Sequence, residues 1–151
     1  MSDRLEIRVA VFVVLEKDNQ IFLLRRANTG WADGMLTLPS GHIDKGETAV
    51  EAAIKETREE AGVEVQAEDL EFLHVHYVHD AYVNFYFKAT TWEGEAVLNE
   101  PHLCSEVMWV NKNEIPEDAI YHVKNLFEQM KTDSKFSDIE NDPNPDVLPI
   151  S

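Results

Sequence analysis

The stretch GHIDKGETAVEAAIKETREEAGV, residues 41–63, predicts a loop, a helix and a helix stop in that order. Thr48 is a good N-cap, and Glu51 three residues later completes a capping box. Gly62 supplies the stop, because glycine adopts the left-handed conformation that ends many helices. We therefore expect a helix from Thr48 to Ala61. Its inward-facing stripe, at helical spacing, consists of Val50, Ala53, Ile54, Thr57 and Ala61.

Three glutamates, Glu56, Glu59 and Glu60, stand at i, i+3 and i+4 and share one face of this helix. Like charges at these spacings destabilise a helix by roughly a few tenths of a kcal/mol per pair. A divalent cation such as Mg²⁺ or Mn²⁺ removes that cost, because these ions prefer oxygen ligands. An ordinary acidic face, neutralised by Lys55 and Arg58, is the alternative.

The loop before the helix holds Gly41, at the end of Leu38-Pro39-Ser40-Gly41, and Gly46. Glycines let a backbone approach neighbouring side chains closely. The sequence thus combines a glycine loop, a capped helix, clustered glutamates and a glycine stop in one compact unit.

This unit resembles the signature of the Nudix (MutT-like) hydrolase family: Gly41, Glu47 and then residues 55–63 match its spacing without a gap. Lys55 replaces the usual Arg and Thr57 the usual aliphatic residue. Lysine keeps the charge but loses the bidentate fork, and we expect Lys55 to orient neighbouring carboxylates. Glu47 is expected to brace the loop or contact Lys55.

The resemblance covers about residues 5–130, with Ser40 in place of a family glycine. It implies the Nudix fold, a mixed β-sheet sandwiched between helices, and hydrolysis of a nucleoside diphosphate linked to another group with Mg²⁺ or Mn²⁺. Carried over to this chain, Glu56 and Glu60 are direct metal ligands. Glu59 is a ligand or the base that activates water, and the Gly41 carbonyl is a further ligand.

A late-loop acid often assists in this family, and Glu95, Glu100 and Glu106 are the candidates here. We favour Glu100, because the Asn99-Glu100-Pro101 loop precedes the expected strand that carries Trp109. An ordinary solvated carboxylate is the alternative.

Substrate phosphates are expected to meet cationic side chains near the cleft, with surface ion pairs as the alternative role. The candidates are Arg8, Arg25 and Arg26. Five aromatic residues are candidates for base stacking or for the core and its rim: Trp31, Tyr77, Tyr82, Phe85 and Tyr86. His74 and His76 alternate on a strand as a zinc pair would, but the sequence offers no third ligand.

Strands are expected on both sides of the first helix, so the chain is a mixed α/β or α+β domain. The expected strands are 5–15, 21–24, 36–38, 70–78, 82–91 and 106–110, with a loop at 40–47, an acidic loop at 93–105 and a closing helix at 118–131. One domain spans 1–131. The tail, 132–151, has five acidic residues against one Lys and three prolines, so we expect it to be disordered or loosely packed.

The formal charge of −16, from 13 basic and 29 acidic residues, disfavours nucleic acid and anionic membranes as partners. No apolar run reaches the ~18 residues of a membrane span, and the charged start does not resemble a signal peptide. Cys104 alone cannot form an internal disulfide, and we expect it to be a small buried residue. We expect a cytoplasmic protein with a small nucleotide-type substrate, and a homodimer stays open.

Three functions fit these observations. The first is a metal-dependent hydrolase of nucleoside triphosphates, oxidised nucleotides or nucleotide sugars. The second is an isoprenoid diphosphate isomerase, which the short chain and the missing cysteine motif disfavour. The third is a non-catalytic nucleotide sensor, which would usually lose the glutamates that this chain keeps.

Overall fold

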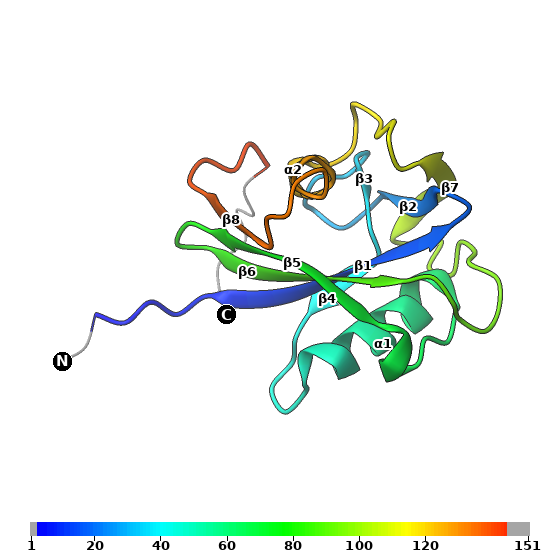
Figure 1. The fold of residues 1–151 in the computed structure, drawn as a ribbon, viewed down its shortest axis with the longest axis horizontal. Helices are drawn as coiled ribbons and strands as arrows, with labels where there is room; N and C mark the ends of the chain where they lie inside the picture. The colour runs from blue at the N-terminus through cyan, green and yellow to red at the C-terminus, as the bar shows by residue number, and fades with distance from the viewer. Residues whose placement is uncertain (1–2, 145–151) are drawn as a thin grey trace.

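The computed structural model describes residues 3–144, which form two α-helices and a mixed set of strands (Figure 1). The strands are β1 (Arg8–Lys17), β2 (Gln20–Arg26), β3 (Leu36–Thr37), β4 (Ser40–His42), β5 (Glu71–Val78), β6 (Tyr82–Ala89), β7 (Cys104–Asn111) and β8 (Phe136–Ile139). The helices are α1 (Ala49–Ala61) and α2 (Tyr121–Gln129), with a short 3₁₀ turn at Ala67–Asp69. Neither of these helices is long and apolar enough to cross a membrane.

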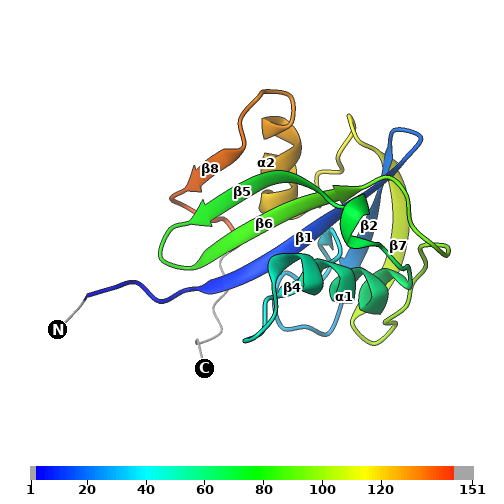
Figure 2. The ribbon, with the colours of Figure 1, turned by 60° about the horizontal axis from the view of Figure 1, so that its bottom comes forward.

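Strand β1 is the centre of the fold. It pairs in parallel with β6 and antiparallel with β4, while β5 and then β8 continue the sheet beyond β6. At its far end β1 pairs with β2, which also holds β3 and β7. Helix α1 covers one face and α2 the other (Figures 1 and 2). The expected mixed sheet between helices is therefore confirmed.

Alternation along β1 divides the core in two, because successive strand residues face opposite sides. Ala10, Phe12 and Val14 belong to the cluster that contains Val123 and Leu126 of α2. Val11, Val13 and Leu15 belong to the cluster on the α1 side. Because β1 is apolar on both faces, it is buried between the two helices. It also positions β2, β4 and β6, the three strands that pair with it.

Helix α1 begins and ends as its sequence predicts. The Thr48 side chain accepts a hydrogen bond from Glu51 N at 3.0 Å, and Glu51 Oε1 accepts one from Thr48 N at 2.9 Å. Gly62 ends the helix with φ of 72°. Ala53, Thr57 and Ala61 are fully buried, which confirms the inward stripe at those positions.

Two short strands differ from the sequence-based expectation. Residues 40–42, expected in a loop, form β4 against β1, and residues 136–139 of the expected loose tail form β8 against β5. Both strands are too short to show a period of two, and each pairs with a partner distant in sequence. The remainder of the predicted tail, residues 145–151, lies outside the described residues.

Candidate active site

A cavity of about 910 Å³ opens beside the C-terminal half of α1 and extends across β1 and β6 towards α2. It brings together most of the site residues expected from the sequence: Gly41, Glu56, Glu59, Glu60, Glu100 and Arg26. These residues come from β4, α1, the loop before β7, and β2. The glutamate face of α1 is therefore one wall of a cavity and not an ordinary solvated surface.

Glu60 is the most enclosed of the three glutamates. Burial raises the pKa of its carboxyl to about 8; the hydrogen bond from Ser40 N, at 2.8 Å to Oε1, opposes this, and the charges of Glu56 and Glu100 add to it. The carboxylate is thus tied to the backbone of β4, but burial outweighs the stabilisation that this hydrogen bond gives to its anionic form.

Glu56 lies between α1 and the start of β4. Burial, followed by the charge of Glu59, raises the pKa of Glu56 to about 7, against the opposing effect of Lys55. A β-carbon at residue 41 would overlap the carboxylate of Glu56, so a residue larger than glycine would push this carboxylate from its place. This contact explains why a glycine stands at the end of the Leu38-Pro39-Ser40-Gly41 segment.

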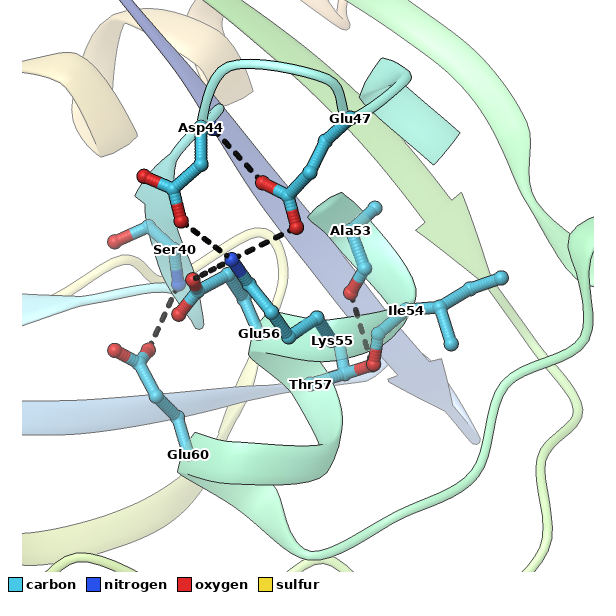
Figure 3. A network of polar contacts seen from close by, with 9 residues as sticks. All are labelled: Ser40, Asp44, Glu47, Ala53, Ile54, Lys55, Glu56, Thr57 and Glu60. Carbon is cyan, nitrogen blue, oxygen red and sulfur yellow. Dashed lines mark hydrogen bonds and ion pairs between the residues drawn. The ribbon is translucent and has the colours of Figure 1, made fainter. Parts of the chain in front are cut away.

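Lys55 braces the loop between β4 and α1 (Figure 3). Its Nζ lies 3.0 Å from Asp44 Oδ2, 2.9 Å from Glu47 Oε2 and 3.8 Å from Glu56 Oε1. Glu47 Oε1 also accepts a hydrogen bond from Asp44 N at 2.8 Å. The expected roles of Glu47 and Lys55 are confirmed: an ammonium group joins the loop carboxylates and reaches the edge of the glutamate cluster.

The donor set fits a hard cation that shares its coordination with substrate and water. No three His, Cys, Asp or Glu side chains within residues 3–144 converge as a ready metal cage. Mg²⁺ does not need one, because it usually takes one or two carboxylates and completes its octahedron with water and phosphate oxygens. Glu56 and Glu60 are suited to such an ion, because their carboxylates are enclosed and burial raises the pKa of both.

Glu100 reaches the cavity because Asn99 is tied to the end of α1. Asn99 Nδ2 donates to the carbonyl oxygens of Arg58, at 3.2 Å, and Glu59, at 2.9 Å. Of the other two late-loop candidates, Glu106 forms an ion pair with Arg25 and neither Glu106 nor Glu95 lines the cavity. The structure thus brings Glu100 alone of the three to the glutamate wall.

The three arginines are in different places. Arg26 lines the cavity and its guanidinium stacks on Trp31 at 4.7 Å from the ring centroid. Arg25 faces the opposite side of β2, does not line this cavity and pairs with Glu106 and Asp118, which favours the alternative role of a surface ion pair. Arg8 contacts Tyr82 Oη at 3.3 Å and does not line this cavity.

Of the aromatic candidates, Trp31 and Tyr82 line the cavity, whereas Tyr86 is fully buried and stacks on Phe12. Both ring nitrogens of His74 form hydrogen bonds, one with Ser134 O and the other with Ser137 Oγ, so the structure does not support a zinc site at His74 and His76. Cys104 is buried, as expected, at 4% exposure.

Sequence reasoning missed three residues at the far end of the cavity: Asn84 of β6, His122 of α2 and Asp142 after β8. Asn84 alone gave a signal, as the one polar residue amid the run Tyr82–Phe87 of β6. His122 and Asp142 lie near the cavity only because α2 and the C-terminal segment fold over the sheet.

Comparison with known proteins places this geometry in a family. A model of the NUDIX domain matches residues 5–130. The 8-oxo-dGTP diphosphatase of Escherichia coli K12 is 31% identical over 128 residues, which are 80% of this chain and 98% of that protein. The ADP-ribose pyrophosphatase of Methanocaldococcus jannaschii is 44% identical over 55 residues, 36% of this chain but only 32% of that protein.

A solved structure gives the same fold. The crystal structure of a MutT NUDIX hydrolase from Burkholderia pseudomallei covers 82% of this chain and 98% of its own, with a TM-score of 0.74 at 23% identity. The solved structure shows the fold, and the family model and the sequence matches show the class of protein. The chain belongs to the Nudix family, as a MutT-like Nudix hydrolase.

Proposed function

We propose that this protein is a metal-dependent hydrolase that cleaves a phosphoanhydride bond in a nucleoside diphosphate linked to another group, with nucleoside triphosphates as the preferred class. The observation that carries the proposal is the cavity itself. It joins a wall of half-buried carboxylates, Glu56 and Glu60, to a space of about 910 Å³, and pockets for small molecules typically have volumes of ≈ 300–1,000 Å³.

In this proposal Glu56, Glu60 and the carbonyl oxygen of Gly41 hold Mg²⁺ or Mn²⁺. The bound ion would neutralise phosphate charge and lower the pKa of a coordinated water. Glu59, at the exposed edge of the same helix face, acts as a further ligand or accepts the proton of the attacking water. Glu100 approaches from the opposite loop, and Arg26 binds a phosphate oxygen. The water attacks phosphorus in line, and the leaving phosphate or nucleotide takes the bond electrons.

The relatives support this substrate class. The relative that this chain covers almost completely is a diphosphatase of a modified nucleoside triphosphate, whereas the pyrophosphatase of a nucleotide sugar matches over a short segment. Nucleoside triphosphates are therefore the first substrates to test, with oxidised nucleotides and nucleotide sugars after them.

The test is a panel of dGTP, dATP, 8-oxo-dGTP and ADP-ribose, incubated with the protein in Mg²⁺, in Mn²⁺ and in excess EDTA. We expect release of pyrophosphate or nucleoside monophosphate that stops in EDTA. Hydrolysis in H₂¹⁸O identifies the attacked phosphorus by the labelled product. Binding of these nucleotides without release of any product would overturn the proposal and indicate the non-catalytic sensor instead.

A further inference from the structure

The chain continues past the family domain and returns to the loop after β2. The NUDIX match ends at residue 130, and β8 then pairs in parallel with β5 at the edge of the sheet. The residues that follow β8 contact both the start of α2 and the loop after β2. A segment outside the family match thus reaches the loop that follows Arg26.

Asn144 joins this segment to its surroundings. Its Oδ1 accepts a hydrogen bond from Tyr121 N, at the first residue of α2, at 3.2 Å. Ile120, the N-cap, has an apolar side chain that cannot cap the helix, so Asn144 supplies the cap from a distant segment. Asn144 N donates to Asp142 Oδ1 at 2.8 Å, and Asn144 Nδ2 lies 3.4 Å from Met35 Sδ. These contacts fix the carbonyl group of Asn144 in space.

That carbonyl group holds Trp31 of the loop after β2. Trp31 Nε1 donates to Asn144 O at 3.0 Å. The loop needs such a contact from outside, because Ala32 adopts φ of 49°, a left-handed conformation that is strained for residues other than glycine. A strained conformation of this kind persists where the surrounding structure fixes it. Asn144 therefore contributes to the shape of the loop as well as to the position of the indole.

Trp31 in turn holds Arg26, through both its backbone and its ring. Arg26 Nε donates to Trp31 O at 2.8 Å, and Arg26 Nη2 donates to Thr29 Oγ1 at 2.9 Å. The guanidinium also stacks on the indole, 4.7 Å from the ring centroid. An arginine side chain has many rotamers, and these three contacts select the one in which Arg26 lines the cavity.

We propose that Asn144 is a positioning residue for the reaction: it holds Trp31, and through Trp31 it fixes the guanidinium of Arg26 that binds the substrate phosphates. Asn144 does not line the cavity, so it acts through these neighbours. The inference rests on the proposed function, in which Arg26 is a phosphate ligand. The chain of contacts from Asn144 to Arg26 can nevertheless be tested without substrate.

Three variants test this chain of contacts in the full-length protein, with dGTP, dATP and 8-oxo-dGTP as substrates in Mg²⁺. Trp31→Phe removes the indole N–H but keeps an aromatic ring beside Arg26, and Asn144→Ala removes the cap on α2. Both should raise KM about fivefold for all three nucleotides with little change in kcat, because one hydrogen bond contributes about that factor to an equilibrium. Asn144→Asp keeps an acceptor for Tyr121 N, and a carboxylate is favourable at a helix N-terminus, so it should restore the wild-type KM.

Two controls carry the same substitutions elsewhere. Trp92→Phe changes a tryptophan that stacks on Trp109, and Asn113→Ala changes an exposed asparagine. Neither residue lines the cavity, so both variants should keep the wild-type KM. The double variant with Trp31→Phe and Asn144→Ala should raise KM no more than either single variant, because both changes break one chain of contacts. Additive effects, or an unchanged KM in both single variants, would overturn the inference.

A spectroscopic measurement separates this inference from the proposed function. In ¹H–¹⁵N spectra of the protein without substrate, the Nε–H signal of Arg26 and the indole N–H signal of Trp31 report the two contacts. Asn144→Ala should shift both signals, and Asn144→Asp should return them towards the wild type. An Arg26 signal that does not move would overturn the inference, even where Asn144→Ala lowers the melting temperature. If both signals move and no nucleotide is hydrolysed, the proposed function fails and the positioning of Arg26 by Asn144 stands.

Discussion

The carboxylate of Glu56 in α1 occupies the space where a side chain at residue 41 of β4 would begin, and this residue is a glycine. The register of β4 on β1, with Gly41 opposite Val11, sets the backbone of residue 41 against the Glu56 carboxylate. The position of Glu56 in the cavity therefore depends on a residue that contributes no side-chain atom.

Gly41→Ala should displace the Glu56 carboxylate, because the new methyl group would overlap it. Misplacement of about 1 Å at a reacting centre can cost about a hundredfold in rate, and overpacking costs about 1–3 kcal/mol of stability. Turnover and the midpoint of urea unfolding measure the two effects. Gly46→Ala is the control: its φ of 91° is unfavourable for alanine but no atom lies near its β-carbon, so we expect a loss of stability of about 1–2 kcal/mol with activity kept. Equal kcat in Gly41→Ala and wild type would show that Glu56 is not needed where it lies.

Glu60→Gln should abolish turnover while leaving the fold intact, because glutamine retains the shape and the acceptor for Ser40 N but not the charge. Its stability profile should also differ. The folded pKa of Glu60, about 8, exceeds the ordinary 4.5, so the folded state holds a proton that the unfolded chain releases. Without metal the free energy of unfolding of the wild type should thus fall as pH rises from 4.5 to 8, by on the order of 1–3 kcal/mol.

In Glu60→Gln the free energy of unfolding should depend much less on pH, and the variant should melt above the wild type at pH 8 in EDTA. A smaller dependence of the same sign remains, because the pKa of Glu56 is also raised. Saturating Mg²⁺ should raise the melting temperature of the wild type more than that of the variant. Scanning calorimetry at pH 5 and pH 8 decides the point. A variant with wild-type turnover would remove Glu60 from the site.

Arg25→Ala and Arg26→Ala should have different effects although the residues are adjacent. Arg25 forms partly exposed ion pairs outside the cavity, so its loss should cost about 1 kcal/mol of stability and leave KM unchanged. Arg26 lines the cavity, so its loss should raise KM about tenfold for a nucleoside triphosphate. Steady-state kinetics with unfolding curves separate the two. A raised KM in Arg25→Ala with no change in Arg26→Ala would reverse the assignment.

Asn99→Ala should release the loop that carries Glu100 from the end of α1. It removes two hydrogen bonds, to the carbonyls of Arg58 and Glu59, worth about 1 kcal/mol together at an exposed site. We expect kcat to fall several-fold, as in Glu100→Gln, but with a stability loss that Glu100→Gln lacks. If Glu100→Gln lowers kcat and Asn99→Ala does not, the loop keeps its place without Asn99.

Local signals explain what the sequence could predict. The ends of α1, the glutamate face and the Lys55–Glu47 contact all lie within one unit of about twenty residues, where spacing decides the geometry. The remote end of the cavity is different. Asn84, His122 and Asp142 come from a strand, a helix and a segment after β8, and no local pattern records their approach. The separation of Arg25 from Arg26 likewise depends on the bounds of β2 and on which face of the strand meets the cavity.

Strand β1 has a further consequence, for the order of events during synthesis. Its parallel partner is β6, with Arg8 opposite Tyr82 and Leu15 opposite Ala89. An emerging chain holds β1 and α1 outside the ribosome well before β6 appears, so during that time β1 lacks its parallel partner and the core on the α1 side lacks Phe87 and Ala89. The central ladder closes only through contacts of long sequence separation, which slow folding relative to local contacts. The wall of glutamates should therefore become rigid late, when β6 docks. A chaperone-free translation system with arrested chains that end before and after β6 would reveal that step as the onset of protease resistance in α1.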